Sequence, residues 1–169
     1  MSEMILLNDY KLIKVLGKGS FGTVYLTTKI NDNKYYATKI LDIKKIKSQD
    51  MKKYLANEIK IMKELKNNEN IIHLYDLFKT QNHYYLIMEY CNGGSLSEIL
   101  KDYKLKYSKP FSQEIIQYYM RQIVDGLVYI HSRKIIHRDI KLDNILVHFE
   151  NEEDKKNLNL LKSKTKIIA

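Results

Sequence analysis

Three glycines close to the start of the chain limit the fold more than any other feature. Residues 17–24 read G-K-G-S-F-G-T-V, and the strand-like run Thr23 to Thr28 follows directly. A dinucleotide-binding fold needs such glycines to open a helix, so the run that follows argues against it. Glycines also let backbone N–H groups approach phosphate oxygens, because no Cβ stands in the way. The sequence therefore predicts a phosphate-binding β-hairpin, with a purely structural glycine turn as the alternative.

The chain divides into a strand-rich part followed by a helical part. Short β-type runs separated by turn residues dominate up to residue 90. These runs are Tyr10 to Leu16, Thr23 to Thr28, Tyr35 to Ile40, Ile72 to Phe78 and Tyr84 to Tyr90. After Gly93-Gly94 the apolar spacing becomes helical, and Ser112 is suited to cap a helix that runs to about Ser132. The boundary between the two parts falls near residues 91–95.

One helix interrupts the strand-rich part, and Ser48 is suited to cap it. The apolar positions that form one stripe along this helix are Met51, Leu55, Met62 and Leu65. The member missing from the middle of the stripe is Glu58, and a buried carboxylate without a cation is costly. Strand alternation places Ala37 and Lys39 on one face, where small Ala37 leaves room for a flat adenine. Lys39, otherwise an ordinary exposed lysine, is the natural partner of Glu58.

Residues 137–144 read H-R-D-I-K-L-D-N and carry three side chains suited to phosphoryl transfer. Asp139 can accept the proton of an attacking hydroxyl, and Asn144 can supply an oxygen to Mg²⁺. Lys141 can neutralise charge on the transferred phosphoryl group. The alternative is an accidental polar turn, and the glycine hairpin, Lys39 and Glu58 earlier in the chain argue against it.

Taken together, these motifs resemble those of the eukaryotic protein kinase family. Residues 137–144 fit the catalytic-loop pattern H-R-D-x-K-x-x-N, which is the most specific signal in the chain. Lys141, two positions after Asp139, is typical of serine/threonine kinases. The resemblance covers about Tyr10 to Ala169. It implies an α+β, protein-kinase-like bilobal fold, with an antiparallel five-stranded N-lobe that carries helix C and a truncated helical C-lobe.

The resemblance also implies domain boundaries. Residues 1–9 would form an N-terminal extension, 10–90 the kinase N-lobe, 91–95 the hinge, and 96–169 a partial C-lobe through the catalytic loop. Residues 148–164 contain four acidic and four basic residues, and they are predicted to form a charged, solvated loop insertion.

The cofactors implied by the resemblance are ATP and Mg²⁺. Met88 corresponds to the gatekeeper behind the adenine, and the backbone of Glu89 and Cys91 corresponds to the hinge that bonds its edge. The residues expected to bind ATP are Leu16, Gly17, Lys18, Gly19, Ser20, Phe21, Gly22, Val24, Ala37, Lys39, Met88, Glu89, Cys91 and Leu146. The residues expected to act in catalysis are Asp139, Lys141, Asn144, Lys39 and Glu58, with Asn144 also as the metal ligand.

The sequence departs from the family pattern in two places. Ser95 stands where many members carry an acidic residue near the ribose, and the chain ends where a D-F-G motif is expected next. We therefore expect a kinase fragment with little or no phosphotransfer and an apolar face exposed on the helix of residues 112–132. A catalytically inactive kinase-fold module that binds nucleotide or a partner protein is the alternative. Residues 90–96, Y-C-N-G-G-S-L, together with the insertion, also resemble Unc-51-like autophagy kinases.

Composition excludes several other classes. The 169 residues, 44% hydrophobic and 29% charged, suit one packed domain or a piece of one. A net charge of +9 could attract nucleic acid, but no basic stripe with interleaved aromatic residues is present. Cys91 is the single cysteine, and the four histidines outside residues 137–144 lack metal-ligand spacing. No apolar run approaches the roughly 20 residues of a membrane span. We expect a soluble, cytoplasmic (intracellular) protein that acts on protein Ser/Thr hydroxyls, with no nucleic-acid partner and its oligomeric state left open.

Overall fold

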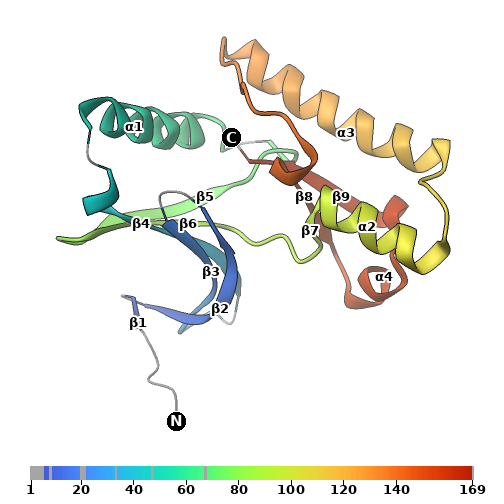
Figure 1. Ribbon diagram of the computed structural model, residues 1–169, viewed down its shortest axis with the longest axis horizontal. Coiled ribbons are helices and arrows are strands. Elements are labelled where there is room, and N and C mark those ends of the chain that lie inside the picture. Colours follow the sequence, from blue (N-terminus) through green and yellow to red (C-terminus); the bar gives the residue numbers. More distant parts are fainter. Residues whose placement is uncertain are drawn as a thin grey trace. The chain divides into compact units, whose positions relative to one another are not determined.

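The computed structural model describes residues 6–7, 9–19, 22–32, 34–46, 48–66 and 68–168, which fall into two units (Figure 1). Unit 1 comprises residues 1–63 and 73–90, and unit 2 comprises residues 64–72 and 91–169. No helix within the described ranges combines the length and the apolar composition that a membrane span requires.

Unit 1 is built on one antiparallel sheet. Its strands are β1 (Leu6–Leu7), β2 (Tyr10–Lys18), β3 (Gly22–Lys29), β4 (Tyr35–Asp42), β5 (Leu74–Lys79) and β6 (His83–Glu89). They lie in the order β1-β2-β3-β4-β6-β5. Five of them are the predicted runs, and the two-residue β1 is added at one edge.

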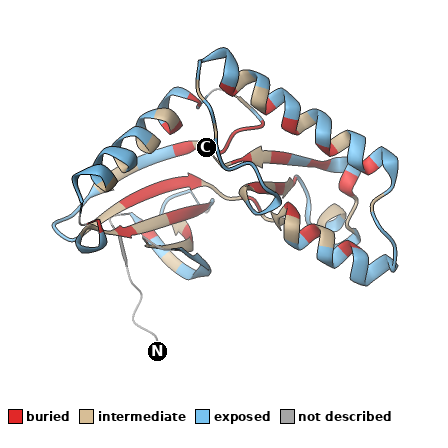
Figure 2. Ribbon diagram, turned by 45° about the horizontal axis from the view of Figure 1, so that its top comes forward, coloured by how far each residue is buried: buried red, intermediate tan, exposed pale blue. Residues whose placement is uncertain are grey.

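The middle of this sheet is buried on both faces (Figure 2). Thr27 and Thr38 are fully buried, and their hydroxyl oxygens lie 2.7 Å apart. The Thr27 hydroxyl also reaches the Tyr36 carbonyl oxygen at 3.4 Å, so the buried hydroxyls are satisfied. The Tyr36 ring in turn packs edge-on against Tyr10, with ring centroids 5.5 Å apart. These contacts hold β2, β3 and β4 together.

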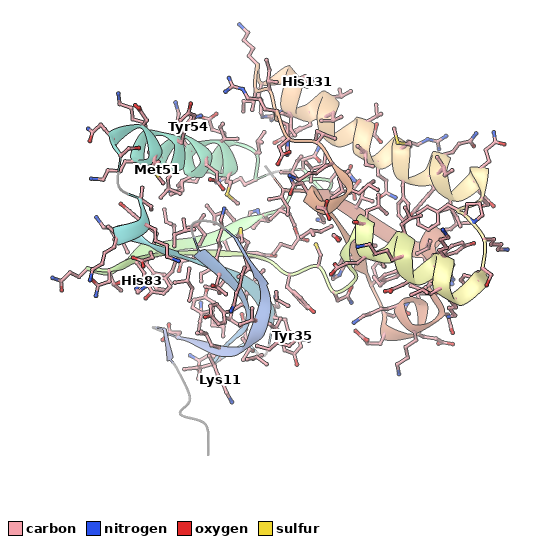
Figure 3. All side chains as sticks on the ribbon, viewed as in Figure 1. Lys11, Tyr35, Met51, Tyr54, His83 and His131 are labelled. Carbon is pink, nitrogen blue, oxygen red and sulfur yellow. The ribbon has the colours of Figure 1, made fainter. Side chains whose placement is uncertain are left out.

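The predicted helix of unit 1 is α1 (Gln49–Glu64), which lies along one side of the sheet after a short 3₁₀ turn, η1 (Ile43–Lys45) (Figure 1). Its cap is the predicted one, because the Met51 N–H donates to the Ser48 hydroxyl at 3.1 Å. The apolar stripe is buried only in its second half. Met62 is 1% exposed, whereas Met51 borders a cavity of about 190 Å³. Figure 3 shows Met51 and Tyr54 on this first half of the helix.

Unit 2 combines two long helices with a small sheet. The helices are α2 (Leu96–Tyr107) and α3 (Gln113–Ser132), and the antiparallel strands are β7 (Gly94–Ser95), β8 (Ile145–Phe149) and β9 (Ser163–Ile167), with the 3₁₀ turn η2 (Leu142–Asn144) before β8. The predicted cap of α3 is present, because the Ile115 N–H donates to the Ser112 hydroxyl at 3.3 Å. One face of α3 packs on β9. A neighbouring face exposes an apolar stripe formed by Ile116, Met120, Val124 and Val128, as expected.

The predicted loop insertion contains regular structure instead. A short helix, α4 (Glu152–Asn157), is capped by the Asn151 side chain, and the 3₁₀ turn η3 (Leu160–Lys162) follows. Leu160 is buried and anchors the segment. The end of α4 is tied to α2, since the Lys106 ammonium reaches the Lys156 carbonyl at 3.0 Å and the Tyr107 hydroxyl reaches the Asn157 carbonyl at 2.8 Å. The solvated-loop prediction therefore has to be corrected: a capping asparagine and one apolar anchor give this charged segment a fixed fold.

The stretch between α1 and β5 belongs to unit 2. The Ile167 N–H donates to the Asn70 carbonyl at 2.7 Å, and the Ile72 N–H donates to the Ile167 carbonyl at 2.9 Å. The Asn70 amide adds a bond of 3.3 Å to the Thr165 carbonyl. Because this segment pairs with β9, strand β5 begins at Leu74 and not at the predicted Ile72.

Candidate active site

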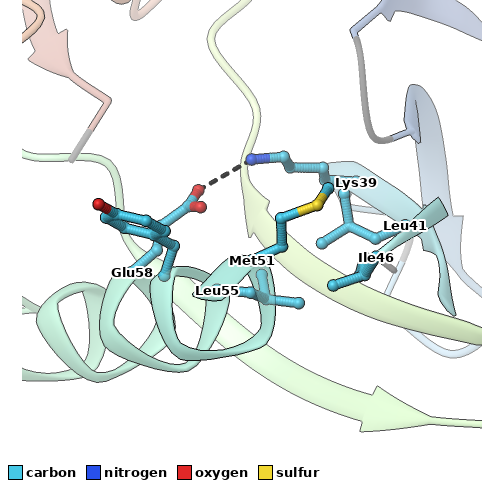
Figure 4. Close-up of a pocket in the computed structure, with 7 residues that line it drawn as sticks. Lys39, Leu41, Ile46, Met51, Leu55 and Glu58 are labelled. Carbon is cyan, nitrogen blue, oxygen red and sulfur yellow. Dashed lines mark hydrogen bonds and ion pairs between the residues drawn. The ribbon is translucent and has the colours of Figure 1, made fainter. Parts of the chain in front are cut away.

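In unit 1, Lys39 and Glu58 form an ion pair. Lys39 extends from β4, Glu58 extends from α1, and the Lys39 Nζ lies 2.8 Å from the Glu58 Oε1 (Figure 4). The pairing inferred from the lone carboxylate on the apolar stripe is thus present. The side chains are 31% and 37% exposed, so the pair adds only about 0.2–1 kcal/mol to stability. Its main effect is to fix the direction in which the Lys39 ammonium points.

The three glycines lie in the β2–β3 hairpin, as predicted. Gly17 pairs with Val24 across the hairpin, and the Gly19 N–H donates to the Gly22 carbonyl at 2.8 Å. Only Gly22 is required by packing, because a Cβ there would lie 1.9 Å from the Ile40 carbonyl oxygen. A Cβ on Gly17 would meet none of the described atoms within 4 Å. Since packing does not explain Gly17, the spacing favours a ligand over a purely structural turn. Ser20 and Phe21 lie outside the described residues.

The positions expected to face the adenine from unit 1 lie on adjacent strands. Ala37 on β4 pairs directly with Met88 on β6, and both side chains are buried. Val24 on β3 pairs with Lys39, so it lies opposite a position two residues along β4 from Ala37. Leu16 on β2 is exposed. The Glu89 N–H is used by the sheet, since it donates to the His73 carbonyl at 2.8 Å.

In unit 2, the three polar side chains of the predicted catalytic loop converge. The Lys141 Nζ and the Asn144 Nδ2 each lie 2.8 Å from the Asp139 Oδ2. The Asn144 Nδ2 also donates to the Asp139 carbonyl at 2.9 Å. Because Nδ2 makes these bonds, Oδ1 is the atom that Asn144 can offer to a metal ion.

The electrostatics of this loop keep Asp139 ionised. Hydrogen bonds from Lys141 and then Asn144 hold the pKa of the Asp139 carboxyl below its usual range. The same contact raises the pKa of the Lys141 ammonium. Both side chains are more than half exposed, so an incoming hydroxyl can reach the carboxylate. A carboxylate with a lowered pKa is a weak base, so Asp139 is suited to a proton acceptor's role in which it mainly orients a hydroxyl.

Two further residues of the loop, His137 and Arg138, had no role predicted from the sequence. The His137 side chain contacts the Ile168 carbonyl through Nε2, and the Asp139 N–H donates to its Nδ1 at 3.2 Å. Arg138 adopts a positive φ of 69°, a strained backbone conformation that clusters at functional sites. Both residues belong to the H-R-D pattern, so the motif itself was the sequence signal that could have identified them.

The segment that follows unit 1 leads into α2. Cys91 is buried, and Leu146 lies on β8, two residues after Asn144. Ser95, expected near a ribose, is the N-cap of α2: its hydroxyl accepts from the Glu98 N–H at 3.2 Å, and the Glu98 carboxylate accepts from the Ser95 N–H at 2.8 Å. This capping box was missed because Ser95 was interpreted only as a ligand position.

Comparison with known proteins identifies the family to which the Lys39–Glu58 pair and the Asp139 loop belong. Residues 10–163 match the protein kinase domain. The chain belongs to the protein kinase family. That match includes Lys39, Glu58, Asp139 and Asn144, and it confirms the α+β kinase fold expected from the sequence.

The kinase relatives include serine/threonine enzymes. The chain is 40% identical over 139 residues to serine/threonine-protein kinase PLK4 of Xenopus tropicalis, which covers 82% of this chain and 14% of the relative. It is 35% identical over 153 residues to calcium-dependent protein kinase 4 of Plasmodium berghei (strain Anka), covering 90% and 28%. It is 34% identical over 135 residues to serine/threonine-protein kinase PLK2 of Mus musculus, covering 80% and 19%. The chain thus spans between 14% and 28% of the length of these kinases.

A magnesium ion fits the kinase loop of unit 2. Mg²⁺ retains several waters and needs only one or two side-chain oxygens beside substrate phosphates. The Asn144 Oδ1 can serve as one of them. Within the described ranges there is no group of three or more His, Cys, Asp or Glu side chains that could hold a metal by themselves. His83 begins β6 in unit 1, and His131 lies in the last turn of α3 in unit 2 (Figure 3).

Proposed function

We propose that this chain carries the ATP-binding and catalytic-loop residues of a protein serine/threonine kinase, which transfers the γ-phosphate of ATP to Ser or Thr hydroxyls of protein substrates. The observation that carries the proposal is the convergence of Lys141 and Asn144 on one carboxylate oxygen of Asp139. The preference for Ser and Thr rests on Lys141 and on the named serine/threonine relatives.

The proposed mechanism assigns one task to each side chain. Asp139 orients the substrate hydroxyl and accepts its proton as the oxygen attacks the γ-phosphorus, while the bond from that phosphorus to the bridging oxygen breaks and ADP leaves. Lys141 neutralises negative charge on the transferred group, and Asn144 would hold Mg²⁺, which supplies further charge stabilisation when bound. In unit 1, Lys39 would bind ATP phosphate oxygens, with Glu58 fixing its direction.

The nucleotide-binding residues proposed for each unit follow from the same assignment. Unit 1 would contribute Leu16, Gly17, Lys18, Gly19, Ser20, Phe21, Gly22, Val24, Ala37, Lys39, Met88 and Glu89, and unit 2 would contribute Cys91 and Leu146. Gly17 supports this set, since no packing constraint within the described residues accounts for it.

Three finer statements belong to the same proposal. The domain boundaries are those given above, with the hinge at residues 91–95. An intracellular location agrees with a chain whose single cysteine, Cys91, excludes an internal disulfide. A closer relationship to Unc-51-like kinases stays a prediction, and the relatives described above are polo-like and calcium-dependent kinases.

The test separates nucleotide binding from transfer. Titration calorimetry of the 169-residue protein with Mg·ATP is expected to show one site that Asp139→Asn leaves intact. The 169 residues contain no Asp-Phe-Gly sequence, so transfer is measured on a gene product that includes one, with a generic protein substrate and ³²P-labelled ATP. Absence of ATP binding contradicts the proposal. Binding without transfer in the longer product favours a catalytically inactive module that binds nucleotide or a partner protein.

A further inference from the structure

The residue after Cys91 makes an unusual contact for a linker position. The Asn92 side chain spans to the backbone of Phe149, 57 residues later: its Nδ2 donates to the Phe149 carbonyl at 3.0 Å, and its Oδ1 accepts from the Phe149 N–H at 2.8 Å. An amide side chain thus takes the place that a neighbouring strand would occupy at the last residue of β8. Both bonds are partly buried, which protects them from competition by water.

The next two residues strengthen the same attachment. The Gly93 N–H donates to the Val147 carbonyl at 2.9 Å, and Gly94 pairs with Val147 in the β7–β8 ladder. A Cβ on Gly93 would lie 2.6 Å from the Val147 carbonyl oxygen, so only glycine permits this approach. Gly94 has a φ of +76°, which glycine adopts at little cost. The chain leaving Cys91 is therefore fixed to β8 at successive residues.

Strand β8 carries two of the proposed site residues. Ile145, Val147 and Phe149 are buried in unit 2, so Leu146 points to the opposite face of the strand. Asn144, the proposed metal ligand, precedes the strand directly. Fixing the backbone after Cys91 to β8 consequently fixes it relative to Leu146 and Asn144, all within unit 2.

We propose that Asn92 is a positioning residue for the adenine of ATP. Its two bonds hold the Cys91 backbone, which would meet the edge of the base, at a set distance from Leu146, which would meet its face. Because these contacts are in place before the nucleotide binds, binding avoids the free-energy cost of ordering a mobile linker. This inference rests on the proposed function, since it concerns the same nucleotide.

The decisive variant is Asn92→Asp, which keeps the size of the side chain. A carboxylate can accept from the Phe149 N–H but cannot donate to the Phe149 carbonyl, and it places two oxygens against each other. The dissociation constants of Mg·ATP and of adenosine are measured by calorimetry on the 169-residue protein. We expect both to rise by the same factor, about five- to tenfold, as for the loss of one to two partly buried hydrogen bonds. Asn92→Ala, which removes both bonds, serves if the aspartate variant does not fold.

Two further variants make the comparison specific. Lys39→Met is expected to weaken ATP and leave adenosine unchanged, because Lys39 is assigned to the phosphates. Asn151→Asp is the matched control, because Asn151 lies two residues beyond Phe149 and its side-chain amide also makes two hydrogen bonds. It accepts from the Asp154 N–H at 2.8 Å and donates to the Asp154 carboxylate at 2.6 Å. That variant should lower the melting temperature and leave both dissociation constants unchanged.

Each remaining outcome is informative. Unchanged affinities in folded Asn92 variants, or a loss confined to the melting temperature, overturn the inference and leave the proposed function standing. A loss for ATP without a loss for adenosine also overturns it, because the effect then lies at the phosphates. If the unmodified protein binds neither ligand, the proposed function fails, and the assignment of Asn92 fails with it.

Discussion

The two lysine–carboxylate pairs among the proposed site residues have the same nitrogen–oxygen distance and different origins. Lys39 and Glu58 meet at 2.8 Å across a strand and a helix 19 positions apart, while Lys141 and Asp139 meet at 2.8 Å within one loop, two positions apart. The first pair depends on where α1 lies, and the first half of α1 borders a cavity. The second depends on local backbone and on Asn144. A change in the position of α1 would therefore break the first pair and leave the second intact.

The largest effect is expected from the local pair. Asp139→Asn removes the proton acceptor while preserving its shape, so phosphotransfer should fall about 10²- to 10⁴-fold. The measurement is the initial rate of the longer, Asp-Phe-Gly-containing product with saturating ATP. The ATP dissociation constant should change less than twofold, since Asp139 is not assigned to nucleotide binding. A variant that keeps the normal rate would remove Asp139 from the mechanism.

The next prediction compares the packing of the two halves of α1 by making the same methionine-to-alanine substitution in each. Met62→Ala empties a fully buried position and should lower the free energy of unfolding by about 2–5 kcal/mol. Met51→Ala, beside the cavity, should cost about 1 kcal/mol or less because its side chain already lacks neighbours on one side. Urea unfolding followed by circular dichroism measures both. Equal losses would show that the first half of the helix is as well packed as the second.

The long-range pair can be broken from either side. Lys39→Met should raise the ATP dissociation constant about tenfold or more, as for a lost bond to a charged group. Its effect on unfolding should stay below about 1 kcal/mol, since both side chains are about one-third exposed. Glu58→Gln keeps the lysine and should give a smaller loss of ATP affinity. If Glu58→Gln were the more damaging change, Glu58 would have a role beyond directing Lys39.

The smallest effect is a pH shift confined to the catalytic loop. Because the pKa of Asp139 is lowered in the folded protein, its ionised form favours folding above the unfolded-state pKa, and this contribution disappears as pH falls through the folded-state value. Lys141→Met removes the first cause of the lowering, so the Asp139 midpoint should move upward. Carboxyl-carbon NMR titration between about pH 2 and pH 6 measures this shift, with Lys155→Met as a control on a distant lysine. An unchanged midpoint contradicts the arrangement.

Sequence spacing was enough for the residues whose chemistry is local or breaks a pattern. Glu58 interrupts an apolar stripe, which predicted its pairing with Lys39. The residues of the 137–144 motif lie within one loop, so their convergence was predictable from order alone. The glycine hairpin followed from the strand-like run after it. These are cases in which neighbours along the chain determine the geometry.

Three features were not predicted from spacing, and the reason differs for each. Asn92 bonds to Phe149, and nothing in its surroundings in the sequence distinguishes it from an ordinary turn residue. The helix α4 was hidden by the eight charges of residues 148–164, because its apolar anchor, Leu160, lies outside the helix itself. Ser95 was assigned a ligand role, although the Glu98 three residues later is a capping-box signal that the sequence did contain.

The attachment of residues 64–72 to β9 makes unit 1 discontinuous along the chain. An excised piece ending at residue 90 would carry Ile71 and Ile72 without β9, uncovering two buried apolar side chains and leaving Asn70 without its strand partner. During synthesis, β5 and β6 can join the first sheet long before β9 emerges. In the nascent chain this short segment therefore stays unpaired until its partner, about 95 residues downstream, has been synthesised. The long separation raises the contact order and leaves apolar side chains exposed in an aggregation-prone intermediate.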